Sequence, residues 1–171
     1  MRSPSRKITM MAAFVAVGLI MGYIESFIVL PVNIPGVRIG IANIAVVLAM
    51  YLLGPVYGAC ILLVRVILAA ILFGSGVSFL YSLCGGIFSY AVMVVLSKHG
   101  FSVYGVSVAG AVVHNLAQTV VACLLIGSIL VLNYIPILII VGVFAGLLVG
   151  FVSDIIYKRL RRIKFFNEEG V

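Results

Sequence analysis

The sequence predicts an all-α integral membrane protein whose six transmembrane helices form one domain over residues 1–171. Hydrophobic residues make up 65% of the chain and charged residues only 9%, whereas soluble domains are about half apolar and about a quarter charged. The hydrophobic residues form continuous runs of about 20 residues, the length that crosses a bilayer as a helix. A membrane β-barrel would instead show alternating apolar and polar residues.

Turn signals divide the apolar sequence into its spans. Pro31 closes the first span, and Gly54-Pro55 stops the second. Residues 74–76 and 98–100 separate the third, fourth and fifth spans, and the fifth is long enough to tilt or to end in an outer loop at Asn133. The six expected spans are 8–30, 38–53, 56–73, 77–97, 102–132 and 135–157.

The net charge of +7 comes mainly from basic residues at the ends of these spans. An even number of spans places both termini on one side, and the positive-inside rule makes that side cytoplasmic. We therefore predict a multi-pass protein of the cell membrane with both termini cytoplasmic. A lipid-headgroup role for the C-terminal cluster is a secondary alternative. The basic residues that carry this prediction are Arg2, Arg6, Lys7, Lys98, Lys158, Arg159, Arg161, Arg162 and Lys164.

The stretch from Ile34 to Tyr51 is the most informative part of the chain. It begins with a Pro-Gly turn, carries Arg38, and continues into an apolar helix that holds Asn43. In a membrane this pattern predicts a short re-entry loop that brings both polar side chains near one bilayer surface. We interpret it as the rim of a binding site.

Polar side chains inside the other spans predict a pocket that opens outward and has its floor near the middle of the membrane. Ionisable groups are costly in lipid and usually functional. Four of the candidates lie in the outer half and four near the middle. The predicted substrate-binding residues are Glu25, Arg38, Asn43, Tyr81, Arg65, His114, Asn115 and Gln118.

A structural role is the alternative for these residues. Arg65 can form an ion pair with Glu25, and the amides can bond neighbouring helices. His114 fits a satisfied core histidine better than a proton relay, and with only 2 histidines in the chain a metal site is weakly supported.

Small residues at four-residue spacing predict close helix packing. Ala12 and Ala16 lie on a face of the first span that is nearly opposite to the face carrying Glu25, so we predict that they dock a partner protein. Ordinary packing or lipid exposure is the alternative. Gly142, Gly146 and Gly150 in the last span predict close contact within the bundle.

Motifs for catalysis are missing from the sequence. It contains no P-loop, no aspartate-rich magnesium-diphosphate motif and no cluster of metal ligands. The chain has only 4 acidic residues. We therefore expect a binding protein that is not an enzyme by itself and that uses no metal or other cofactor.

Three separated blocks carry a resemblance to a known family. Residues 35–44, 79–86 and 105–118 resemble the Gx transporter family, which is also described as heptaprenyl diphosphate synthase component I. That family is similar to the substrate-binding S components of energy-coupling factor (ECF) vitamin transporters. The resemblance implies a six-helix bundle that binds a micronutrient from outside, under its first loop. It also implies docking of a coupling subunit through an Ala-x-x-x-Ala motif, which Ala12 and Ala16 match, and ATPase subunits on separate chains.

The function expected from the sequence is therefore that of a substrate-binding membrane subunit of an ECF-type uptake transporter. The alternative is a membrane accessory component of a heptaprenyl diphosphate synthase, or an isoprenoid-binding protein. Arg38 and Arg65 suit a carboxylate or a diphosphate, so an anionic or isoprenoid-like ligand fits either function. Membrane lipid is a further expected partner, and nucleic acid is not.

Overall fold

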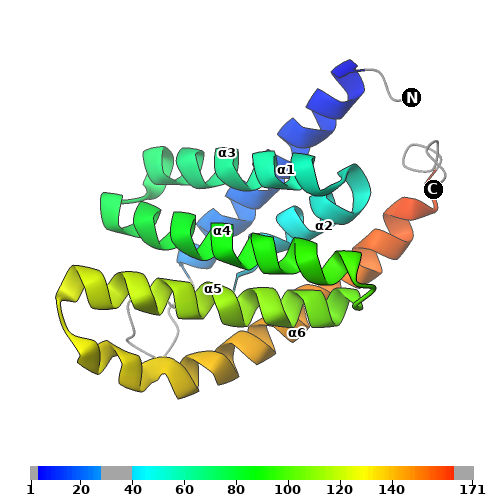
Figure 1. Ribbon diagram of the computed structural model, residues 1–171. Helices are drawn as coiled ribbons and strands as arrows, with labels where there is room; N and C mark the ends of the chain where they lie inside the picture. The colour runs from blue at the N-terminus through cyan, green and yellow to red at the C-terminus, as the bar shows by residue number, and fades with distance from the viewer. Residues whose placement is uncertain (1–3, 28–39, 164–171) are drawn as a thin grey trace.

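The computed structural model describes residues 4–27 and 40–163, and it confirms that the chain is all-helical over them. The helices pack as an elongated bundle in which α1 begins and α6 ends at the same end (Figure 1). The elements are α1 (Pro4–Ser26), α2 (Asn43–Leu53), α3 (Pro55–Phe73), α4 (Gly76–Lys98), α5 (Val103–Ile126), the 3-10 helix η1 (Ile129–Tyr134) and α6 (Ile135–Arg161).

Five helices are long and apolar enough to cross a membrane, namely α1, α3, α4, α5 and α6. Their outer surfaces are apolar, since Leu124, Ile71 and Phe144 are all more than two-thirds exposed. A surface of this kind suits a lipid solvent and would be unfavourable in water. The structure therefore supports the membrane class and five of the predicted spans.

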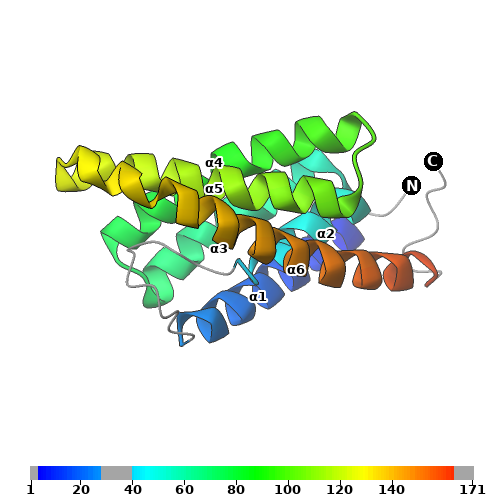
Figure 2. The same cartoon turned by 90° about the horizontal axis from the view of Figure 1, so that it is seen from below.

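Helix α2 is shorter than the predicted second span of residues 38–53. It has 11 residues and is about 16 Å long, roughly half the apolar thickness of a bilayer. Residues 44 to 50 are all buried, because α2 lies inside the bundle between α1 and α6 (Figure 2). A helix that is surrounded by other helices is apolar on every face, which is why its sequence resembles that of a membrane span.

The predicted fifth span, residues 102–132, is wrong at its C-terminal end. Helix α5 ends at Ile126 because Gly127 adopts a left-handed conformation, with φ +68°, and donates its N–H to the Cys123 carbonyl. Glycine adopts this conformation without strain and commonly ends helices. The chain then enters η1, where the hydroxyl of the N-cap residue Ser128 accepts the Leu130 N–H, and continues directly into α6.

Helices α5 and α6 approach each other more closely than ordinary side chains would allow. A Cβ atom added to Gly146 would come within 2.5 Å of the Val108 Cα, and one added to Gly150 would come within 3.0 Å of the Tyr104 Cα. Gly142 makes a similar approach to Val112. The prediction that this glycine motif packs within the bundle is therefore confirmed.

The basic residues gather at one end of the bundle. Arg6 and Lys7 begin α1, Lys98 ends α4, and Lys158 and Arg159 lie in the last turn of α6 (Figure 1). Lys158 is held there by an ion pair of 2.7 Å with Asp154. Of the described lysines and arginines, only Arg65 lies far from this end.

Candidate functional site

The site is built around the N-terminus of α2, which begins inside the bundle. The Glu25 carboxylate on α1 accepts the Gly40 N–H at 2.6 Å and makes a longer contact of 3.5 Å with the Ala42 N–H. Glu25 is buried. Glu25 therefore holds the turn that leads into α2 from a neighbouring helix, and these hydrogen bonds compensate for burying its charge.

Arg65 on α3 joins the same site from the other side. Its Nη2 donates to the Asn43 Oδ1 at 3.2 Å. A Cβ atom at Gly18 of α1 would lie 2.7 Å from the Arg65 Cδ, so the glycine makes room for the arginine stem. The described contacts thus connect Glu25 and Arg65 through the segment from Gly40 to Asn43.

A polar cavity of about 40 Å³ lies between these groups. Each of the first five helices contributes one polar residue to its lining. They are Glu25 from α1, Asn43 from α2, Arg65 from α3, Ser82 from α4 and His114 from α5. The rest of the lining is glycine, alanine or apolar, so the polar groups converge in an otherwise apolar bundle.

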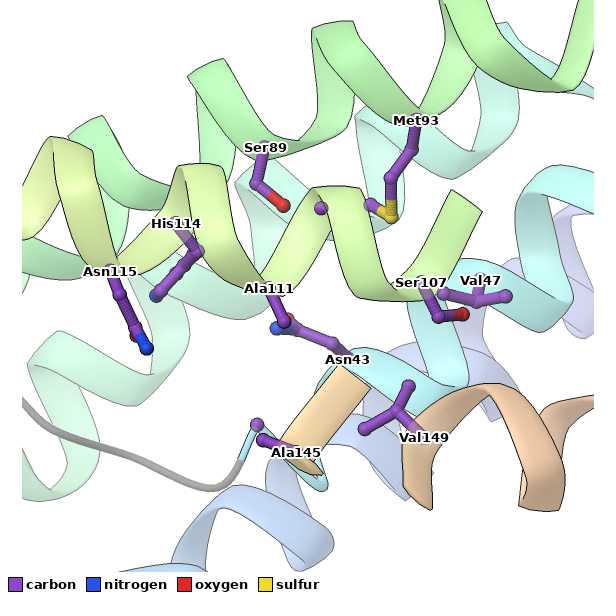
Figure 3. A pocket seen from close by; sticks show the side chains of 12 residues that line it. Asn43, Val47, Ser89, Met93, Ser107, Ala111, His114, Asn115, Ala145 and Val149 are labelled. Carbon is purple, nitrogen blue, oxygen red and sulfur yellow. The ribbon is translucent and has the colours of Figure 1, made fainter. Parts of the chain in front are cut away.

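A second cavity of about 30 Å³ lies between α2, α4, α5 and α6 and shares Gly40, Asn43 and His114 with the first. Figure 3 shows Asn43 reaching toward Ala111 of α5, with His114 further along the same helix. The imidazole also lies against α4, since a Cβ atom at Gly85 would be 2.9 Å from the His114 Cε1. Asn43 and His114 therefore link the two cavities.

The structure brings together Glu25, Asn43, Arg65 and His114 from the predicted set. Asn115 lines the second cavity, but its Nδ2 donates to the Leu138 carbonyl at 3.0 Å and so joins α5 to α6. This is the structural alternative that we considered for the amides.

The remaining predicted residues lie elsewhere. Tyr81 and Gln118 are buried but line neither cavity. Arg38 lies outside the described residues. Sequence reasoning did not select Ser82 and Ser89 of α4, each of which lines one of the two cavities.

The chemistry of the cavity favours binding of a polar or anionic group. A guanidinium, an amide, an imidazole and a carboxylate surround it, and the Ser107 hydroxyl, which is 3% exposed, lines the second cavity without a hydrogen-bond partner among the described residues. Within residues 4–27 and 40–163, no three His, Cys, Asp or Glu side chains gather to hold a metal ion.

The two cavities are small in the described conformation. A buried water needs about 10–15 Å³, and pockets for small molecules usually enclose about 300–1,000 Å³. Volumes of about 30 and about 40 Å³ therefore accommodate a few waters. A larger ligand requires the surrounding side chains or helices to move apart.

The fold and the convergent polar residues define a membrane-embedded helical protein with an internal polar site. A family model described as heptaprenyl diphosphate synthase component I matches residues 14–156. The chain belongs to that family, and the matched region contains every described residue of the site. No curated protein and no solved structure matches the chain.

Proposed function

We propose that the protein is the substrate-binding membrane subunit of an ECF-type uptake transporter. The observation that supports this proposal is the convergence of one polar side chain from each of five helices on a cavity next to the N-terminus of α2. In many transporters, a helix is interrupted near the middle of the membrane, and the N-terminus of the resulting half-helix binds an anionic group of the substrate. The expected substrate is a small molecule with a carboxylate or phosphate group.

The orientation in this proposal follows from the charge distribution. The end that carries Arg6, Lys98 and Arg159 is cytoplasmic by the positive-inside rule. Substrate then enters from the opposite side, the side on which the sequence places Arg38. The protein itself carries out no reaction, and separate ATPase subunits supply the energy for transport.

Docking of a coupling subunit is assigned to α1. Ala12 and Ala16 are exposed on this helix and offer a surface with little side-chain bulk. Ala12→Leu and Ala16→Leu should prevent co-purification of the coupling subunit and leave ligand content unchanged. Ala91→Leu, at an exposed position on α4, is the matched control. Loss of ligand with assembly preserved would reverse the assignment of the two faces of α1.

The binding site is tested by replacing the arginine and the histidine that line its cavity. Arg65→Ala and His114→Ala should lower the amount of co-purified small molecule per mole of protein by about tenfold, because each removes a hydrogen bond to an anionic group. His99→Ala and Arg162→Ala change the same residue types at exposed positions and should have no effect. Unchanged ligand content in both site variants would disprove the proposed pocket.

A second candidate function is that of a membrane accessory component of a heptaprenyl diphosphate synthase, or an isoprenoid-binding protein. The description of the family favours it. Mass spectrometry of the proteins that co-purify in mild detergent separates the two candidates. ATPases together with a membrane coupling subunit would support the transport proposal. A soluble prenyltransferase in stoichiometric amount would support the accessory role and contradict transport.

A further inference from the structure

The second polar cavity contains a buried hydroxyl group that lacks a hydrogen-bond partner. Ser107 of α5 lines this cavity and is buried, and its Oγ has no partner among the described residues. Burial removes the water that would otherwise bond such a hydroxyl, so leaving it unsatisfied is costly. A molecule inside the cavity can supply the missing hydrogen bond.

The described side chains next to Ser107 cannot supply it. Figure 3 shows Ser107 on the side of α5 that faces Val47 of α2 and Val149 of α6. Ala145 also belongs to the α6 wall of the cavity, and a Cβ atom at Gly150 would lie 3.5 Å from the Ser107 Oγ. None of these four side chains can donate or accept a hydrogen bond. The partner of Ser107 must therefore come from the contents of the cavity.

A second hydroxyl borders the same cavity from α4. Ser89 is buried and lines the cavity, and Figure 3 shows it reaching toward α5. A Cβ atom at Gly110 of α5 would lie 3.2 Å from the Ser89 Oγ. The glycine therefore leaves space beside this hydroxyl. Two hydroxyls from two helices thus border one cavity.

The second cavity differs from the first in the charges that line it. Glu25 and Arg65 line only the first cavity. Apart from His114, which lines both, none of the described side chains that line the second cavity is ionisable. A charged group would be costly to bury there, because no opposite charge compensates for its lost hydration. The second cavity therefore favours a neutral group that forms hydrogen bonds.

The two cavities follow one another along the bundle. On α4, Ser82 lines the first cavity and Ser89 the second, and on α5 His114 lines both while Ser107 lines the second. Each pair is separated by about 10 Å along its helix axis, at about 1.5 Å per residue. In both helices the residue of the second cavity is the one nearer the basic end of the bundle. Because Asn43 lines both cavities, one small molecule can extend past it from the first cavity into the second.

We propose that the second cavity is a subsite for a neutral hydrogen-bonding group of the substrate, such as a hydroxyl or an amide, and that Ser89 and Ser107 recognise this group. The inference rests on the proposed function, which places the carboxylate or phosphate of the substrate in the first cavity. It narrows the substrate class to small anions that carry a hydroxyl or amide group at the end remote from the acid. Water occupies the subsite before the substrate binds, since about 30 Å³ accommodates about two waters.

The test compares three acids of equal chain length that differ at the end remote from the first carboxylate. Hexanoate ends in a methyl group, ω-hydroxyhexanoate in a hydroxyl and adipate in a second carboxylate. Isothermal titration calorimetry measures their binding to the full-length protein in phosphatidylcholine nanodiscs. The hydroxy acid should bind about fivefold more tightly than hexanoate, because it supplies a partner for Ser107. It should also bind more tightly than adipate, whose second charge meets no opposite charge in the second cavity.

Serine variants assign this preference to the second cavity. Ser107→Ala combined with Ser89→Ala should bind ω-hydroxyhexanoate about as weakly as hexanoate, while the affinity for hexanoate remains that of the unchanged protein. Ser153→Ala is the matched control, because Ser153 is also buried, its Oγ also has no described partner, and it lines neither polar cavity. This control should keep the full preference for the hydroxy acid.

The outcomes separate this inference from the proposed function on which it rests. Equal binding of hexanoate and ω-hydroxyhexanoate by the unchanged protein, both lost in Arg65→Ala, would leave the acid site intact and show that the second cavity holds water only. A preference for the hydroxy acid that persists without Ser89 and Ser107 would also overturn the subsite. Failure of all three acids to bind the unchanged protein would contradict the proposed pocket itself, and the subsite with it.

Discussion

The two halves of the bundle are held together in different ways. Helices α5 and α6 pack backbone against backbone, because Gly142, Gly146 and Gly150 let the two helices approach closely. Helices α1, α2 and α3 meet instead around a polar cavity, and the described hydrogen bonds of Glu25 and Arg65 connect them. Close backbone packing has little room to adjust, whereas polar contacts around a cavity can exchange with a ligand. We infer that α5 and α6 form the frame and that any opening of the site occurs between α1, α2 and α3.

The largest expected effect comes from disturbing the frame. Gly146→Ala places a methyl group within 2.5 Å of the Val108 Cα, where only backbone can move. We expect a loss of about 2–3 kcal/mol in the free energy of unfolding, at the upper end for overpacking. Thermal unfolding in detergent measures it.

The control for that prediction is a glycine-to-alanine substitution at a position where the new methyl group has no neighbouring atoms. A Cβ atom at Gly76 would have nothing within 4 Å, so Gly76→Ala should leave stability within about 0.5 kcal/mol. Equal unfolding temperatures for the two variants would contradict the close packing of α6 against α5 at Gly146.

A smaller effect is expected from removing the carboxylate that accepts the Gly40 N–H in the turn before α2. Glu25→Ala leaves the Gly40 N–H without its 2.6 Å acceptor, and an unsatisfied buried donor costs about 1–3 kcal/mol. Glu25→Gln retains an acceptor oxygen and should cost less. The expected order of unfolding temperatures is unchanged protein, Glu25→Gln, then Glu25→Ala. A Glu25→Gln variant that is less stable than Glu25→Ala would show that Glu25 does not stabilise the protein as the acceptor of the Gly40 N–H.

A smaller loss of stability is expected where the new methyl group meets a flexible side chain. Gly18→Ala also creates a close contact, at 2.7 Å, but the atom it meets is the Cδ of the Arg65 side chain. A flexible side chain can move aside, so we expect a cost below about 1 kcal/mol. The displaced Arg65 should then hold ligand less well, which the amount of co-purified small molecule reports. A Gly18→Ala variant as unstable as Gly146→Ala would show that the first three helices are as tightly packed as the frame.

Much of the site could be predicted from the sequence because depth in the membrane follows from position along a helix. Glu25, Arg65 and His114 interrupt apolar runs, and helical periodicity places each on a definite face. Their convergence with Asn43 on one cavity is what this periodicity implies. The same reasoning could not tell Asn115 from Asn43, because it does not show which carbonyl a buried amide will reach.

The errors in the helix boundaries have a common physical cause. Hydropathy does not register a single residue that changes the direction of the backbone, so the fifth span was extended past Gly127. Hydropathy also does not distinguish a helix that faces lipid from one that is surrounded by protein, so the predicted second span of residues 38–53 differs from α2, which begins at Asn43 and is buried. Both differences concern where a helix begins or ends, and neither concerns whether it forms.

The membrane class, the helical fold, the basic end of the bundle and the identity of most polar groups inside it follow from the sequence alone. These properties depend on local composition and on the period of the helix. The tertiary structure was needed to show that Glu25 binds the turn before α2 and that Asn43 lines both polar cavities. The reason is that both depend on where a half-length helix lies among five longer ones, and that position is set by contacts between residues far apart in the chain.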